Sequence, residues 1–144
     1  MKIERICILG GSGFVGTHLV SQLAARGLKV RVLSHRREAA KALILLPTVE
    51  VIEADVHDQH ELVRHFRGVD AVINLVGILH EDKVGRVDLP SARRGDFQKV
   101  HIELARKVIH ACGEAGVHRL LHMSALGAHP NSRSAYQRSK GIAE

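Results

Sequence analysis

The sequence predicts an α/β protein built on one doubly wound parallel sheet, and three observations support this. Short apolar runs alternate with helical patterns along all 144 residues. Strands that are separated by crossover helices pair in parallel, and right-handed crossovers place helices on both faces of the sheet. The chain is 45% hydrophobic and 25% charged, which is typical of a globular domain, and its length suits a single one.

Three strands are predicted in the first half of the chain. A continuous apolar run such as ICIL is typical of a strand buried on both faces. The three strands cover residues 5–9, 29–33 and 49–54. Helical patterns separate and follow them, each ended by a glycine or stopped before a proline. These helices cover residues 14–26, 38–46 and 58–66.

The second half continues the alternation and completes five strands. Residues 70–76 (DAVINLV) and 119–123 (RLLHM) are the fourth and fifth strands. A helical pattern over 97–115 ends at Gly116, and a last helix begins at residue 134 and runs to residue 144. The long polar stretch 77–95 could line a substrate site.

Composition and charge narrow the classes of partner. The net charge is +6, but no nucleic-acid motif accompanies it, and 3% aromatic residues without tryptophan cannot build a stacking platform. We therefore expect a phosphorylated small molecule and no nucleic acid. The eleven histidines lack metal-ligand spacing, so no metal site is predicted. Cys7 and Cys112 are interpreted as buried free thiols, and with no membrane span or secretory segment we expect a cytoplasmic protein.

A glycine-rich turn over residues 10–16, here called the glycine turn, follows the first strand. Its glycines at 10, 13 and 16 remove side chains where the backbone must turn tightly, approach a phosphate, or let the helix pack closely. The helix that follows offers free N–H groups and the positive end of its dipole. A surface loop is the alternative, but the strand before and the helix after favour dinucleotide binding in a Rossmann-type domain.

The ends of the next strands bear on the choice of cofactor. Arg36 and Arg37 follow the second strand where an acidic residue would bind a ribose hydroxyl, which favours the 2′-phosphate of NADP(H) over NAD(H). A solvated helix start is the alternative. Asp55 and Val56 are predicted to meet the adenine. Along the cofactor we expect Asn74, Val76 and Gly77, although any of these strand-end residues could be an ordinary cap.

Tyr136, the only tyrosine, is followed four residues later by Lys140, which places both on one face of a helix. An ammonium near the phenol favours its ionised form, so that Tyr136 could exchange a proton with a substrate while a hydride moves to or from nicotinamide. Ser124, after the fifth strand, could hydrogen-bond the same substrate oxygen. A Tyr/Lys pair at this spacing also occurs by chance.

The chain resembles the short-chain dehydrogenase/reductase superfamily, in its extended or atypical branch of NAD(P)-dependent epimerases and dehydratases. The resemblance lies in the order of its motifs, which are the three glycines, Asp55, Asn74, Ser124 and the pair Tyr136 and Lys140. The runs CILGGSGFVGTHLV, NLVGIL and HMSALGA are most similar to the complex I-associated nucleotide-binding subunits and their bacterial relatives. The resemblance implies a catalytic set of Ser124, Tyr136 and Lys140, with Lys140 also on the nicotinamide ribose and Arg36 near the 2′-phosphate. It further implies cofactor phosphate contacts from Gly10, Ser12, Gly13, Phe14, Val15 and Gly16.

Two departures from that family qualify the expected activity. His101 occupies the place of an asparagine that many members use in a proton relay. The chain also ends four residues after Lys140, so we expect residues 1–144 to be the NAD(P)-binding portion of a longer protein without its substrate domain. The prediction is an NAD(P)-dependent oxidoreductase or epimerase acting on an unknown small molecule. The alternative is a nucleotide-binding module without turnover, with association in a homo-oligomer or a respiratory complex.

Overall fold

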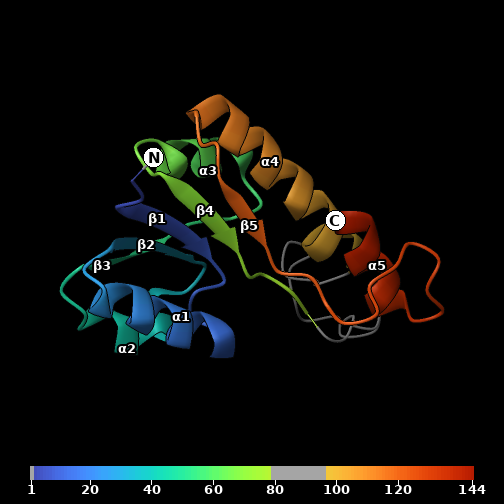
Figure 1. Ribbon diagram of the computed structural model, residues 1–144, viewed down its shortest axis with the longest axis horizontal. Helices are drawn as coiled ribbons and strands as arrows, with labels where there is room; N and C mark the ends of the chain where they lie inside the picture. Colours follow the sequence, from blue (N-terminus) through green and yellow to red (C-terminus); the bar gives the residue numbers. More distant parts are fainter. Residues whose placement is uncertain (1, 79–96) are drawn as a thin grey trace. The chain divides into compact units, whose positions relative to one another are not determined.

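The computed structural model describes residues 2–78 and 97–144. Its centre is a five-stranded sheet in the order β3-β2-β1-β4-β5, and every neighbouring pair is parallel (Figure 1). The doubly wound sheet expected from the sequence is therefore confirmed. The strands are β1 (Arg5–Leu9), β2 (Lys29–Ser34), β3 (Val49–Glu53), β4 (Ala71–Asn74) and β5 (Leu120–His122).

The register of the strands brings their carboxyl ends to one edge of the sheet. Leu9, the last residue of β1, pairs with Leu33 on β2 and with Asn74 on β4. The end of β2 pairs in turn with Glu53 of β3, and the end of β4 pairs with His122 of β5. In open α/β sheets this edge is where ligands bind.

The chain divides into two compact units that are described separately. The first comprises residues up to Leu75 and Lys107–Met123, and it holds the whole sheet. The second comprises Val76–Arg106 and Ser124–Glu144. The helical segments are α1 (Phe14–Ala25), η1 (Arg37–Ala40), α2 (Lys41–Ile44), α3 (Gln59–Phe66), η3 (Gln98–Glu103), α4 (Leu104–Ala115) and α5 (Ala135–Ala143).

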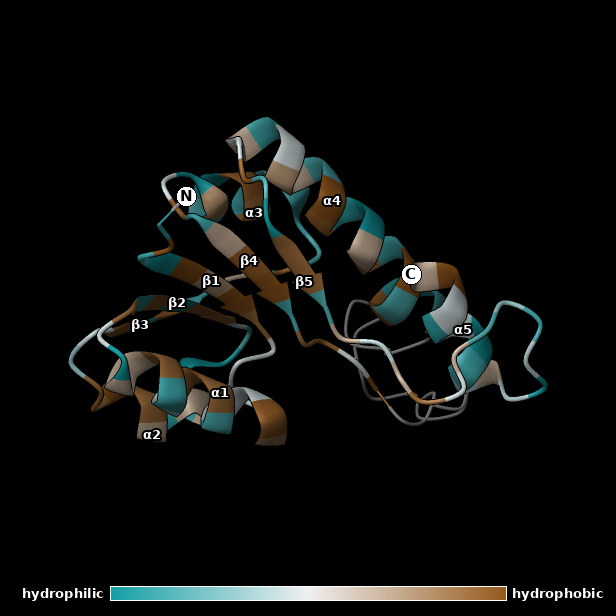
Figure 2. Cartoon of the chain, in the orientation of Figure 1, coloured by the Kyte–Doolittle hydropathy of each residue, from teal (hydrophilic) through white to brown (hydrophobic). Residues whose placement is uncertain are grey.

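Within the first unit, helices cover both faces of the sheet, as the crossover rule requires. Helices α1 and α2 lie on one face, and α3 with the 107–115 part of α4 lies on the other (Figure 1). Figure 2 shows β1 and β4 as predominantly hydrophobic. Cys7, Ile8 and Leu9 of β1 have no exposed surface, so the central strand is buried on both sides.

The edge strand β5 differs from the central strands. Leu121 is 50% exposed and the neighbouring Met123 is 42% exposed, because β5 has a pairing partner on one side only among the described residues. Apolar side chains are therefore exposed on and beside this strand. Cys7 and Cys112 are buried free thiols, as expected.

Three predicted elements differ in detail. The helix expected over 38–46 is a 3₁₀ turn followed by a single α turn, because Ala40 leaves the helical region at φ −109° and ψ 23°. The helix over 97–115 opens as a π-helical segment, η3, before it continues as α4. The strand β4 ends at Asn74 instead of Val76. Most of the polar stretch 77–95 lies outside the described residues.

Candidate functional site

The glycine turn connects the carboxyl end of β1 to α1, and its backbone geometry requires glycine at two positions. Gly10 has φ +76°, in the left-handed region that side chains disfavour. Gly16 lies against the backbone of the turn, because a Cβ there would stand 2.5 Å from the carbonyl oxygen of Gly10 and 2.6 Å from the Cα of Gly11. The turn and the helix therefore approach each other more closely than a residue with a Cβ at position 16 would permit.

The amino end of α1 carries no side-chain cap. Its N-cap is Gly13, and the first turn contains no acidic residue. Gly13 is exposed, and a Cβ there would make one ordinary contact, 3.5 Å from the carbonyl oxygen of Gly10. Ser12 is half-buried, whereas Phe14 is 85% and Val15 is 50% exposed. Uncapped N–H groups at an accessible helix end suit an anion such as a phosphate.

The carboxyl end of β2 presents two arginines to solvent. The buried Ser34 shapes the bend, because its hydroxyl donates to the carbonyl of Arg36 at 2.8 Å and accepts from the amide of the same residue at 3.3 Å. Arg36 and Arg37 are both exposed. The backbone thus brings two arginines directly after the carboxyl end of β2, and guanidinium groups can form forked hydrogen bonds with a phosphate.

Asp55 and Asn74 lie at the same edge of the sheet and have structural partners there. Asp55 Oδ1 accepts from the amide of His57 at 2.9 Å, and the amide of Asp55 donates to Glu61 at 3.2 Å. Both bonds shape the turn that also contains the half-buried Val56. Asn74 is 1% exposed, and its side-chain nitrogen lies 3.3 Å from Nδ1 of His122. This contact links β4 to β5 beyond the backbone ladder.

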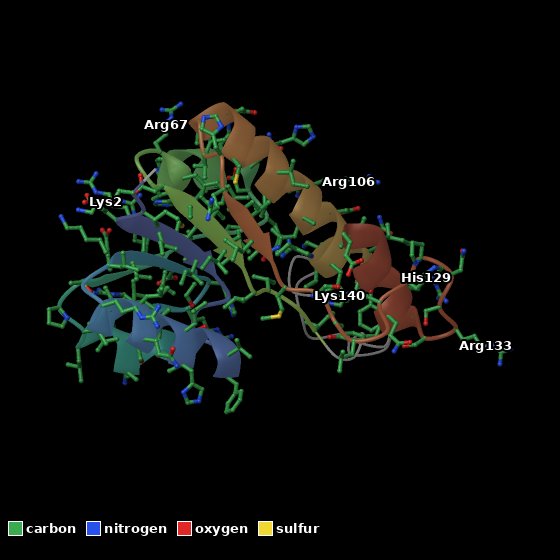
Figure 3. The ribbon with its side chains drawn as sticks, viewed as in Figure 1. Lys2, Arg67, Arg106, His129, Arg133 and Lys140 are labelled. Atoms are coloured by element: carbon green, nitrogen blue, oxygen red, sulfur yellow. The ribbon has the colours of Figure 1, made fainter. Side chains whose placement is uncertain are left out.

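In the second unit, Lys140 belongs to α5 (Figure 3). Its side chain is buried. Burial lowers the pKa of its amine from the ordinary 10.5, because desolvation disfavours the charged form. A Cβ on Gly77 would lie 3.4 Å from Lys140 Nζ and 3.5 Å from Nε2 of His101. Gly77 and Lys140 are therefore brought together, with His101 beside them, and the half-buried Val76 directly precedes Gly77.

Tyr136 lies in an aromatic cluster of the second unit. Its ring meets the rings of Phe97 and His101 edge to face, at centroid distances of 6.0 and 5.6 Å. The hydroxyl of the third member of the predicted catalytic set, Ser124, donates to the carboxylate of Glu144. In Figure 3, His129 and Arg133 lie on the loop that precedes α5, and Arg133 points outward.

Two residues of these arrangements were not singled out by sequence reasoning. A Cβ on Gly11 would lie 2.8 Å from Cγ1 of Val32, so this fourth glycine lets the turn pack on β2. The Gly-Gly pair was the available signal. Ser139 is 5% exposed and lies 2.8 Å from His101. No local pattern marks this contact, because 38 residues separate the two.

Among residues 2–78 and 97–144, no three His, Cys, Asp or Glu side chains gather closely enough to hold a metal ion. In the same ranges, no helix has the length and apolarity that a membrane crossing requires.

Residues 10–143 match a protein-family model described as NAD(P)H-binding. Curated relatives include a mouse mitochondrial NADH dehydrogenase [ubiquinone] 1 alpha subcomplex subunit 9, which is 29% identical over 142 residues. That alignment covers 95% of this chain and 35% of the relative. A 3-beta-hydroxysteroid dehydrogenase from Mycolicibacterium neoaurum is 27% identical over 83% of this chain and 31% of its own length. The chain thus spans about a third of these relatives.

Solved structures share the fold. A dTDP-glucose 4,6-dehydratase from Streptomyces venezuelae, crystallised with NAD and DAU bound, has a TM-score of 0.74 and 24% identity. The alignment covers 96% of this chain and 49% of that one. An oxidoreductase from Lactococcus lactis matches with a TM-score of 0.74 and 22% identity, over 96% of this chain and 60% of its own.

Proposed function

Because the chain belongs to the NAD(P)H-binding family, we propose that it binds NADP(H) through the glycine turn and supports proton transfer for a hydride reaction of a small-molecule substrate. One observation carries the cofactor part of this proposal. Gly16 is packed against the backbone of Gly10 while the helix end at Gly13 stays uncapped and open. The pairing of a compressed turn with an accessible helix end is what a diphosphate requires.

The preference for the phosphorylated cofactor rests on charge. Arg36 and Arg37 supply two exposed cations just after β2, and neither Ser34, the last residue of that strand, nor the following His35 carries a carboxylate. A ribose with two free hydroxyls is bound best by an acidic residue at this place, whereas a 2′-phosphate is bound best by arginine. Asp55 and Val56 at the end of β3 are proposed to lie against the adenine. Farther along the cofactor, contacts are proposed from Asn74, Val76 and Gly77.

The proton chemistry is assigned to Ser124, Tyr136 and Lys140. When bound, the nicotinamide supplies or accepts the hydride. In the oxidative direction, Tyr136 takes the proton of the substrate hydroxyl as that carbon–oxygen bond becomes a carbonyl, and Ser124 hydrogen-bonds the same oxygen. The Lys140 amine binds the nicotinamide ribose and favours the ionised tyrosine. Burial of Lys140 removes water that would otherwise screen its charge, while the same burial lowers the pKa of the amine.

A titration with NADPH, NADH and adenosine 2′,5′-bisphosphate tests the cofactor assignment. We expect saturable binding of NADPH and of the bisphosphate, with NADH at least about tenfold weaker, because one 2′-phosphate contributes charge-assisted hydrogen bonds. The matched variant Gly13→Val fills the open space at the helix end and should reduce binding of NADPH and NADH alike. Absence of saturable binding by any dinucleotide would reject the proposal.

A second candidate function is a nucleotide-binding module without turnover, docked in a larger assembly. The observation in its favour is the likeness, over 95% of this chain, to subunits of mitochondrial NADH dehydrogenase. The two candidate functions share the cofactor site but differ in the role of Tyr136, which exchanges a proton with a substrate only in the first. A module without turnover would bind NADPH and fail to reduce or oxidise any member of a panel of hydroxysteroids and nucleotide sugars, which are the substrate types named in the relatives.

A further inference from the structure

Three buried polar side chains gather in the second unit, next to the proposed tyrosine. His101, Ser139 and Lys140 are 1%, 5% and 3% exposed. Burying such groups is unfavourable unless each is hydrogen-bonded, so an arrangement of this kind persists only where its partners are in place. His101 and Ser139 have no part in the proton chemistry assigned above.

His101 is held by contacts on both ring nitrogens. The amide of Ile78 donates to Nε2 at 3.0 Å, which makes this nitrogen an acceptor without a proton. A neutral imidazole then carries its proton on Nδ1, which lies 2.8 Å from the hydroxyl oxygen of Ser139. The backbone amide thus selects the tautomer.

The chain of hydrogen bonds continues into α5. The hydroxyl of Ser139 donates to the carbonyl oxygen of Tyr136 at 2.8 Å. Ser139 therefore accepts from His101 and donates to the helix turn whose two ends are Tyr136 and Lys140. Three donors and three acceptors are matched in one direction, from the amide of Ile78 to the backbone of Tyr136.

The same residues converge on Gly77. Lys140 Nζ and His101 Nε2 both reach the place that a Cβ on Gly77 would occupy, at 3.4 and 3.5 Å. A protonated His101 would set a second cation beside the lysine and would turn Nε2 from an acceptor into a donor facing the Ile78 amide. The neutral Nδ1–H form is the one that both contacts permit.

We propose that His101, as a neutral Nδ1–H imidazole, is a positioning residue that holds the Tyr136–Lys140 turn of α5 against residues 77–78 through Ser139. This inference rests on the proposed function for its consequence, since the turn it positions is the one assigned to the nicotinamide end of the cofactor. The π-helical segment η3 contains His101, and such segments occur often at functional sites because they displace a side chain from regular helical register.

The tautomer is tested without any ligand. Nitrogen-15 shifts of the His101 ring, assigned by comparison with the His101→Gln variant, should show a protonated Nδ1 and a bare Nε2 at neutral pH. A ring protonated on Nε2, or on both nitrogens, would overturn the proposal. This outcome does not depend on whether the protein binds a dinucleotide.

The positioning role is tested with two ligands and three variants. Adenosine 2′,5′-bisphosphate carries only the adenosine end of the cofactor, whereas NADPH also carries the nicotinamide end. His101→Phe retains the ring contacts with Phe97 and Tyr136 but loses both hydrogen bonds. We expect His101→Phe and Ser139→Ala to bind NADPH about tenfold more weakly, with binding of the bisphosphate unchanged within about twofold.

The conservative variant His101→Gln separates hydrogen bonding from packing. Its amide offers one acceptor and one donor, so NADPH affinity should recover to within about threefold of the original protein. Equal weakening by the phenylalanine and glutamine variants would overturn the proposal, as would parallel loss of both ligands, which would indicate a role in folding alone. If the unaltered protein binds the bisphosphate but these variants bind NADPH normally, the positioning role fails while the proposed function stands. Failure of the unaltered protein to bind either ligand would overturn both.

Discussion

A Cβ on Gly16 would stand 2.5 Å from the carbonyl oxygen of Gly10. The atom in its way belongs to the backbone, so no side-chain rotation can relieve the contact. The glycine turn is compressed at this point, and the compression brings the amino end of α1 against the end of β1. Gly13, in the same turn, is under no such constraint, which makes it possible to separate folding from binding.

Gly16→Ala should destabilise the fold. The added methyl must displace the backbone of residues 10–11, and overpacking of this kind costs about 1–3 kcal/mol. Chemical denaturation followed by circular dichroism measures the loss in the free energy of unfolding. An unchanged midpoint would contradict the close approach.

Gly13→Ala is the matched control for this change. Its φ of −76° suits alanine, and its Cβ would meet nothing closer than 3.5 Å, so the free energy of unfolding should change by less than about 0.5 kcal/mol. Because the methyl would protrude where a phosphate is proposed to bind, NADPH affinity should nonetheless fall. Full retention of affinity in Gly13→Ala would place the phosphate elsewhere.

Replacing Arg36 and Arg37 together by alanine should weaken NADPH about tenfold to a hundredfold and leave NADH within about threefold, since charge-assisted hydrogen bonds to a phosphate are absent from NADH. Isothermal titration calorimetry on both cofactors measures the ratio. The double variant Arg26→Ala/Arg133→Ala removes the same charge elsewhere and should not alter selectivity. A uniform loss for both cofactors would show that the two arginines act through general electrostatic attraction only.

Tyr136→Phe should abolish turnover while changing NADPH affinity by less than about threefold. The phenylalanine ring can keep the edge contacts with Phe97 and His101 and lacks only the hydroxyl that exchanges the proton. General acid–base groups contribute about 10²–10⁴-fold in rate. Steady-state rates on the hydroxysteroid and nucleotide-sugar panel provide the measurement, and undiminished turnover in the variant would remove Tyr136 from the mechanism.

The buried thiol of Cys7 predicts a loss of stability in alkali. Burial raises the pKa of Cys7 from 9.0 to about 12. Above pH 9 the thiol of the unfolded chain ionises while the folded one stays protonated, so the free energy of unfolding falls as pH rises toward 12. Each pH unit in this window costs about 1.4 kcal/mol, or about 2 kcal/mol between pH 9 and 10.5.

Urea denaturation of the protein and of Cys7→Ala, under reducing conditions at both pH values, isolates this contribution. The variant should lose about 2 kcal/mol less over the interval, because it has no thiol at this position. Cys112, whose pKa burial raises to about 11, is present in both proteins and cancels in the comparison. Identical pH dependence in the two proteins would contradict the burial of Cys7.

The sequence alone was sufficient for the sheet, the alternation of its elements and the family, because these depend on local patterns. An apolar run such as residues 6–9 is too short for a helix and too apolar for a loop. The glycines at 10 and 16 both belong to the short glycine turn that follows it. Helix ends were also predicted closely where a capping side chain is local, as at Asp58 and Ser134, which accept hydrogen bonds from the first turns of α3 and α5.

Only the tertiary structure decided which distant residues meet. Asn74 was predicted from its strand-end position, yet its contact with His122 crosses 48 residues, and the bond between His101 and Ser139 crosses 38. The division of the predicted 97–115 helix into η3 and α4 is likewise not visible in its apolar spacing. Periodicity along a chain indicates which face of an element is buried, but it carries no information about the element that packs against that face. The hydrogen bonds that orient buried side chains are formed with that partner, so only the tertiary structure determines them.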